Sequence, residues 1–188
     1  DIESLSKIKL KNIKPYLVNE WKNSSGFIYF KAETEDKKKI FIKSRGIEES
    51  SSREYKVIKE LRNVNPKYFP KELYFKSGKD VNYIAMEEVE GQRLDRLINL
   101  AEFETKPNHY KENLYNGIFN ILKILHKLKI VHRDIRPQNL IIKHDGTPVL
   151  IDFQFAVDVK RIKYKEFQIV KKKPELIVGL GDKFAKNI

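Results

Sequence analysis

The sequence predicts an α+β protein of two lobes: five antiparallel strands and one helix, followed by a second lobe that is mostly helical. Three observations predict it. Short runs of aromatic and β-branched residues, separated by polar turns, fill the first half. One helical spacing of apolar residues interrupts those runs, and longer helical patterns dominate the second half. The 188 residues are enough for two small lobes that share a cleft.

The first lobe contains five runs with the composition of β-strands. We predict strands at Tyr16–Trp21, Phe27–Ala32, Lys39–Lys43, Leu73–Lys76 and Asn82–Glu87. Between the third and fourth run, Tyr55, Ile58 and Leu61 recur at the spacing of a helix face, so residues 48–61 are predicted to be helical. Five strands and one helix would complete this lobe.

The second lobe is predicted from a different pattern. A short helix is expected at Leu94–Leu100 and a long one at Tyr110–Leu128, with apolar residues on one face. Two short strands, Leu140–Ile142 and Val149–Ile151, flank a turn. The lobe boundary is expected near Glu88–Gly91, so that residues 1–89 form the first lobe and residues 90–188 the second.

The charge of the chain favours anionic partners. Thirty-eight Lys and Arg residues against 26 Asp and Glu give a formal charge of +12, which attracts nucleotides, lipid headgroups, phosphorylated sugars or nucleic acid. The excess is concentrated in Lys160–Lys173, which is either a solvated face or a contact to an anionic substrate or membrane surface. Aromatic residues are too sparse among these lysines for a nucleic-acid surface, so no nucleic-acid partner is expected. With no cysteine, disulfides and thiolate metal sites are excluded.

One pair of motifs points to a specific chemistry. Val131–Asn139 reads V-H-R-D-I-R-P-Q-N, and Leu150–Gln154 reads L-I-D-F-Q. An isolated Asp in a loop is usually a turn or cap residue, but the joint order resembles H-R-D-x-x-x-x-N and D-F-G of the eukaryotic-like protein kinase superfamily. The resemblance implies that Asp134 orients an acceptor hydroxyl and takes its proton, while Asn139 and Asp152 hold Mg²⁺ through oxygen.

Two earlier stretches agree with this resemblance in the expected order. Ile40–Lys43 resembles V-A-I-K of the third strand, which implies that Lys43 binds the α- and β-phosphates of ATP. Arg53–Leu61 resembles the αC helix, with Glu54 as the acid that pairs with this lysine and Glu60 as a second candidate. Taken singly, any such Lys or Glu would be read as a solvated surface charge.

The resemblance also implies an adenine site and one further catalytic group. Residues 86–91 are similar to the hinge, with Met86 as gatekeeper and the backbone of Glu87 and Val89 as adenine partners. The glycine-rich loop keeps only Gly26, and Ile28 aligns with the valine of G-x-G-x-x-G-x-V, so the resemblance implies that both contact the nucleotide. Arg136 replaces a lysine and would keep a positive charge near the transferred phosphate.

The chain departs from the kinase pattern at several places. Phe41 stands where a small alanine packs against adenine, and Gln154 replaces the last glycine of D-F-G. No A-P-E segment can be traced after Phe155, and no Ser or Thr occurs from Ala156 to Ile188. These departures resemble the bacterial lipopolysaccharide and sugar kinase branch, which implies a role in lipopolysaccharide biosynthesis.

Three functions stay open on this basis. The expected one is transfer of the γ-phosphate of ATP to a sugar or glycolipid hydroxyl, in the cytoplasm and, if the basic segment binds lipid, at the inner face of the membrane. The alternatives are a serine/threonine protein kinase with a protein hydroxyl as acceptor, and a pseudokinase that binds nucleotide without transfer. The first two require ATP and Mg²⁺ as cofactors.

Overall fold

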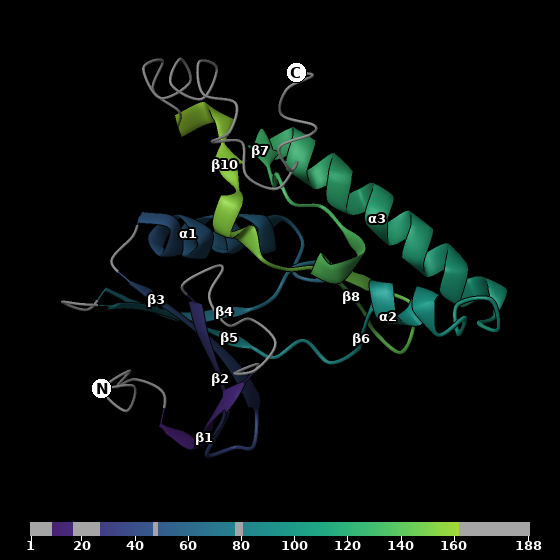
Figure 1. Cartoon of the computed structure of the whole chain (residues 1–188). Helices are drawn as coiled ribbons and strands as arrows, with labels where there is room; N and C mark the ends of the chain where they lie inside the picture. The colour runs from purple at the N-terminus through teal and green to yellow at the C-terminus, as the bar shows by residue number, and fades with distance from the viewer. Residues whose placement is uncertain (1–8, 17–26, 47–48, 78–80, 162–188) are drawn as a thin grey trace.

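A computed structural model describes residues 9–16, 27–46, 49–77 and 81–161 (Figure 1). The strands are β1 (Leu10–Tyr16), β2 (Phe27–Thr34), β3 (Lys39–Gly46), β4 (Glu72–Ser77), β5 (Val81–Glu87), β6 (Gln92–Arg93), β7 (Ile130–Val131), β8 (Leu140–Ile142), β9 (Pro148–Leu150) and β10 (Val157–Asp158). The α-helices are α1 (Glu49–Val64), α2 (Leu94–Asn99) and α3 (Asn108–Leu128). One-turn 3₁₀ helices occur at Pro137–Asn139, Phe153–Phe155 and Val159–Arg161.

The first lobe is an antiparallel sheet in the order β1-β2-β3-β5-β4. The predicted five-stranded lobe with one helix is therefore confirmed. Helix α1 packs on one face of this sheet, where Val57, Ile58 and Leu61 join Ile84 and Met86 of β5 in the main core. The opposite face has its own small core around Ile40 and Ile42.

The first strand lies earlier in the chain than predicted. Strand β1 covers Leu10–Tyr16, whereas the prediction was Tyr16–Trp21, of which only Tyr16 is among the described residues. The pairing of β1 with β2 is irregular between Lys11 and Lys14, and Asn12 has a φ of 55°. Such a bulge breaks the alternation of a strand, so the sequence pattern of β1 is hidden.

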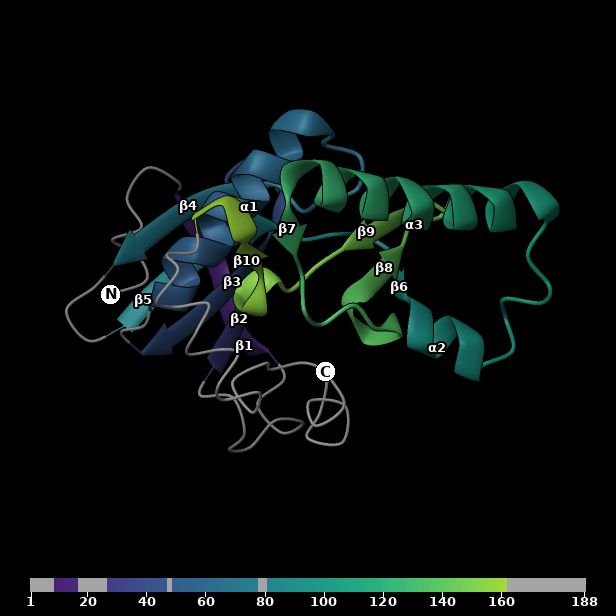
Figure 2. The ribbon, with the colours of Figure 1, turned by 90° about the horizontal axis from the view of Figure 1, so that it is seen from above.

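The second lobe is built around the long helix α3. Its buried face carries Leu114, Gly117, Ile121 and Leu125, and it packs on the small sheet β6-β8-β9 (Figure 2). The same core continues into the first lobe, because these residues and those of α1 form one cluster. Among the described residues, no helix combines the length and the apolar character needed to cross a membrane.

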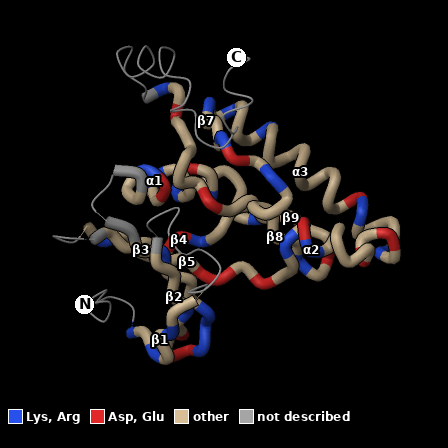
Figure 3. The backbone as a smooth tube through the Cα atoms, in the orientation of Figure 1, with Lys and Arg blue, Asp and Glu red and all other residues tan. Residues whose placement is uncertain are grey.

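An acidic link joins β5 to β6, visible as a red stretch in Figure 3. Three glutamates at the end of β5 and in this link each pair with a lysine. The pairs are Lys71–Glu87 at 2.8 Å, Lys31–Glu88 at 2.6 Å and Lys39–Glu90 at 2.9 Å. Such exposed pairs add little stability, but they hold the link against the first lobe, at the place where we propose the lobe boundary.

Candidate active site

Lys43 is the buried centre of the site. It lies on β3, with its side chain only 4% exposed, and its Nζ donates to Glu54 of α1 at 3.1 and 3.3 Å. The same Nζ donates to Asp152 Oδ1 at 2.6 Å. Glu60, the second candidate for the helix acid, instead binds Lys160 at 2.9 Å. The structure therefore selects Glu54 as the helix partner of Lys43.

Glu54 and Asp152 stabilise the charged form of Lys43. Burial alone would lower the pKa of this lysine, but the charges of Glu54 and Asp152 outweigh burial and keep the pKa above its ordinary value. Burial acts in the opposite sense on Glu54, whose pKa is raised although Lys43 favours its ionised form. We take Glu54 as ionised, because Lys43 donates to both of its oxygens and the N–H of Phe153 donates to Oε1 at 3.2 Å.

The loop after β7 presents Asp134. Its carboxylate is only 5% exposed and receives a hydrogen bond from Asn139 Nδ2 at 2.8 Å. Asn139 Nδ2 also donates to the Asp134 carbonyl at 2.9 Å, which leaves the amide oxygen of Asn139 as an acceptor. Arg136 Nε lies 3.4 Å from the same Oδ2 of Asp134 and is half exposed. The loop thus holds one carboxylate in place through an amide and a guanidinium.

His132 holds this loop through hydrogen bonds at both nitrogens of its ring. Its Nδ1 accepts the N–H of Asp134 at 3.2 Å, so the proton of the neutral ring is on Nε2, which donates to the Ile151 carbonyl at 3.0 Å. The ring also packs edge-on against Phe153, with centroids 4.6 Å apart. Burial lowers the pKa of His132 below its ordinary value and favours the neutral ring.

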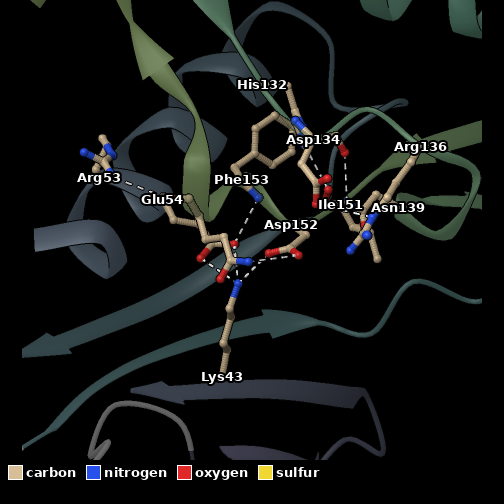
Figure 4. A network of polar contacts seen from close by, with 11 residues as sticks. Lys43, Arg53, Glu54, His132, Asp134, Arg136, Asn139, Ile151, Asp152 and Phe153 are labelled. Carbon is tan, nitrogen blue, oxygen red and sulfur yellow. Dashed lines mark hydrogen bonds and ion pairs between the residues drawn. The ribbon is translucent and has the colours of Figure 1, made fainter. Parts of the chain in front are cut away.

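Backbone pairing joins the Asp134 loop to Asp152. The N–H of Ile151 donates to the Asn139 carbonyl at 3.0 Å, one step from Asp152. Asp152 has a φ of 66°, and this left-handed turn aims its carboxylate toward Lys43 (Figure 4). Lys43, Asp134, Asn139 and Asp152 are therefore brought into one network, as the sequence predicted. The oxygens of Asn139 and Asp152 are the ligands that Mg²⁺ prefers.

The predicted hinge residues lie at the end of β5. Met86 is 7% exposed and part of the main core. The N–H of Glu87 donates to Lys71 O, and the N–H of Glu88 donates to Lys39 O, both at 2.9 Å. Within the described part of the chain the N–H of Val89 has no hydrogen-bond partner. This arrangement suits Val89 as a backbone donor to a base.

Two residues, Gly26 and Ile28, were predicted to contact the nucleotide from the glycine-rich loop. Gly26 lies outside the described residues. Ile28 is opposite Ser44 in the β2–β3 pair, hence on the other face of the sheet from Lys43, and it is 59% exposed. Tyr29 takes the place opposite Lys43. The expectation that Ile28 contacts the nucleotide is therefore not met, because its strand register places it one residue away from the position that faces Lys43.

Aromatic rings line the sheet beside Lys43. Phe41, two residues before Lys43 and on the same face, stacks on Tyr29 with centroids 5.6 Å apart and meets Tyr16 edge-on at 6.2 Å. Lys31 lies over the Tyr16 ring at 4.2 Å. Sequence reasoning identified Phe41 but missed Tyr29 and Lys31. Their position follows from the Tyr29–Lys43 register, which only the length of the β2–β3 turn could have indicated.

Most of the basic segment Lys160–Lys173 lies outside the described residues. Of its lysines, the structure describes Lys160, which pairs with Glu60. The proposed contact of this segment with an anionic membrane surface stays a prediction.

Comparisons with known proteins agree with this geometry. Residues 24–178 match the protein kinase domain family. The chain is 31% identical over 112 residues to serine/threonine-protein kinase C of Synechocystis sp., which covers 57% of the chain and 20% of that protein. It is 32% identical over 142 residues to cyclin-dependent kinase-like 5 of Mus musculus, which covers 71% of the chain and 14% of that protein.

A further similar protein is the serine/threonine-protein kinase PrkC of Bacillus subtilis, at 39% identity over 79 residues, or 41% of the chain and 12% of that protein. The chain thus spans about a fifth or less of the length of these curated relatives. The family match covers most of the chain, including Lys43, Glu54, Asp134, Asn139 and Asp152. This chain therefore belongs to the protein kinase domain family.

Proposed function

We propose that the chain transfers the γ-phosphoryl group of ATP to a serine or threonine hydroxyl of a protein. The observation that carries this proposal is the single network that connects Lys43, Glu54 and Asp152 with the Asp134 loop (Figure 4). A buried cation, an ordered carboxylate and two oxygen ligands are the groups that phosphoryl transfer needs, because positioning and charge stabilisation supply most of the catalysis.

Each residue then has a defined task. Lys43, held by Glu54, binds non-bridging oxygens of the α- and β-phosphates. Asp134 accepts the proton of the acceptor hydroxyl while the bond from oxygen to the γ-phosphorus forms and the bond to ADP breaks. Arg136 adds positive charge near the transferred group. Mg²⁺, which Asp152 and Asn139 are suited to hold, would supply neutralisation of the phosphate charge.

The orientation of Asp134 supports its role as the base. Asn139 and Arg136 both engage Oδ2 of its carboxylate. Among the described residues none pairs with the other oxygen, Oδ1, which is left to meet a hydroxyl. A carboxylate fixed in this way pre-organises the acceptor for an in-line approach.

The acceptor class rests on the comparisons. Two of the relatives described above carry the name serine/threonine-protein kinase, which supports a protein hydroxyl better than the sugar or glycolipid hydroxyl expected from the sequence. We therefore propose the protein acceptor and treat the sugar acceptor as a competing outcome. The chain carries the catalytic Asp134 and the oxygen donors Asn139 and Asp152, so we propose an active enzyme and not a pseudokinase.

A transfer assay separates these outcomes. The chain is incubated with γ-labelled ATP and Mg²⁺, and with dephosphorylated casein, free sugars or lipopolysaccharide cores in separate reactions. We expect label on the protein, and its loss in Asp134→Ala and Asp152→Asn. Asp36→Asn, in the exposed turn after β2, is the matched control and should keep full activity. Label on sugars or lipopolysaccharide alone would overturn the protein acceptor, and no label on any acceptor would overturn transfer itself.

A further inference from the structure

Gln154 lies directly beside the acidic centre of the site. Its side chain is buried, with 7% of the residue exposed. Its Nε2 donates to Asp152 Oδ2 at 3.5 Å, while Lys43 occupies the other oxygen of the same carboxylate at 2.6 Å. The amide of Gln154 therefore contacts one oxygen of Asp152, and the ammonium of Lys43 contacts the other.

The other end of this amide has no hydrogen-bond partner in the part of the chain that the structure describes. Gln154 Oε1 is buried from solvent and accepts no hydrogen bond within the described residues. Buried amide oxygens almost always have a donor or a cation beside them. An unpaired oxygen attached to a group that contacts Asp152 thus points to a ligand at this carboxylate.

The backbone keeps the amide at this position. Arg53 of α1 donates from Nη2 to the Gln154 carbonyl at 3.3 Å. Phe153, the preceding residue, is fully buried, and its N–H donates to Glu54 Oε1. Both neighbouring contacts reach α1, so the backbone that carries Gln154 is held beside Asp152 while its side chain can still turn about its own torsions.

We propose that Gln154 supplies its amide oxygen as a further ligand of the divalent cation at Asp152 and Asn139, an inference that rests on the proposed function. Rotation of the amide by half a turn exchanges Nε2 and Oε1. The N–H group therefore faces the bare carboxylate, and the oxygen faces a bound cation. Amide oxygens are ordinary ligands of hard cations such as Mg²⁺ and Mn²⁺.

Two roles for Gln154 predict opposite effects on cation affinity. If the amide only restrains Asp152, its removal frees a carboxylate oxygen, and cation affinity stays the same or rises. If Oε1 is a ligand, its removal weakens binding. Gln154→Met keeps the length of the side chain without the amide. Gln154→Glu keeps an oxygen at the same distance and adds a negative charge.

The test is direct binding of Mn²⁺ to the full chain with a non-hydrolysable ATP analogue, measured from the signal of free Mn²⁺ by electron paramagnetic resonance. We expect Gln154→Met to weaken Mn²⁺ binding about 10-fold, the lower end of what changes around metal sites cause. Gln154→Glu should bind Mn²⁺ more tightly than the wild type. Gln138→Met, which removes an exposed glutamine beside Asn139, is the matched control and should leave affinity unchanged.

Asp152→Asn separates this inference from the proposed function. If Asp152→Asn loses Mn²⁺ affinity while Gln154→Met does not, the ligand role of Gln154 is wrong and the cation site stands. If neither variant loses affinity, there is no cation at Asp152 and both proposals fail. Should Gln154→Met fail to fold, Gln154→Glu decides: tighter Mn²⁺ binding than the wild type supports the ligand role, and weaker or unchanged binding overturns it.

Discussion

Lys43 Nζ lies 2.6 Å from Asp152 Oδ1, although the two residues are 109 positions apart in the chain. The same ammonium binds Glu54 of α1 at 3.1 Å. One buried cation thus connects β3, α1 and the segment that follows β9. Because Lys43 balances the charge of Glu54 and Asp152, we expect it to contribute to stability as well as to the phosphate binding proposed above.

Removal of Lys43 should destabilise the fold. In Lys43→Met, two carboxylates keep their burial and lose their cation, and we expect the free energy of unfolding to fall by about 3–5 kcal/mol. The double variant Lys43→Met/Glu54→Gln should lose less than the sum of the two single changes, because it removes one of the unpaired charges. Urea unfolding of the four proteins measures this coupling. Additive losses would show that the buried pair does not act as a unit.

Arg136 should affect catalysis but not stability. Its side chain is half exposed and lies 3.4 Å from the carboxylate of Asp134. We expect Arg136→Ala to lower kcat by about 10-fold or more, since it removes a positive charge near the transferred phosphate. Arg136→Lys should retain most of the activity. The matched control Arg96→Ala, on the exposed side of α2, should leave kcat unchanged. An equal loss in the Lys and Ala variants would argue against a role for the charge alone.

Gly117 of α3 should not tolerate alanine. Helix propensity alone predicts a gain of about 1 kcal/mol for Gly117→Ala. A Cβ at this position would lie 2.3 Å from Cδ of Pro148 on β9. Overpacking against a rigid ring costs about 1–3 kcal/mol, so we expect net destabilisation in thermal unfolding. Asn116→Ala, on the exposed side of the same helix, is the control and should be neutral or slightly stabilising. A stabilised Gly117→Ala would show that α3 can move away from β9.

His132 should make the protein sensitive to mild acid. Its pKa in the folded state is lowered by burial, while the unfolded chain has the ordinary value of 6.5. As pH falls below 6.5, the unfolded state takes up the proton first, so stability decreases until the folded pKa is reached. The slope from one such group is at most about 1.4 kcal/mol per pH unit.

The other three histidines, His109, His126 and His144, are exposed, so among the histidines we assign this dependence to His132. Denaturant unfolding at pH 7.5 and 5.5 measures it. In His132→Phe, the difference between the two pH values should shrink. If it does not, groups other than His132 determine the acid sensitivity.

The sequence was most informative where chemistry constrains residue order. The spacing of His132, Asp134, Asn139 and Asp152 predicted the site, because a short loop and a short hairpin hold these side chains at fixed positions. Lys43 and Glu54 followed from a strand and a helix of ordinary pattern. The predicted helix at residues 48–61 corresponds to α1 at Glu49–Val64, and the strand at Asn82–Glu87 to β5.

The sequence was less informative where the register of a strand decides which face of the sheet a side chain occupies. Strand β1 was predicted too late because its bulge at Asn12 disturbs the alternation. Ile28 was assigned to the site face by its distance from Gly26, but pairing with β3 turns Tyr29 to that face. A shift by one residue reverses the face of every side chain in a strand. The unpaired oxygen of Gln154 could not be predicted at all, since it depends on three-dimensional packing.

We propose that Lys43, Asp134, Asn139 and Asp152 surround one ATP with its Mg²⁺. Calorimetric titration with a non-hydrolysable ATP analogue and Mg²⁺ tests it most directly. We expect that the wild type and Asp36→Asn bind equally, and that Lys43→Met and Asp152→Asn each lose about 10-fold or more in affinity. Equal binding by all four proteins would contradict it.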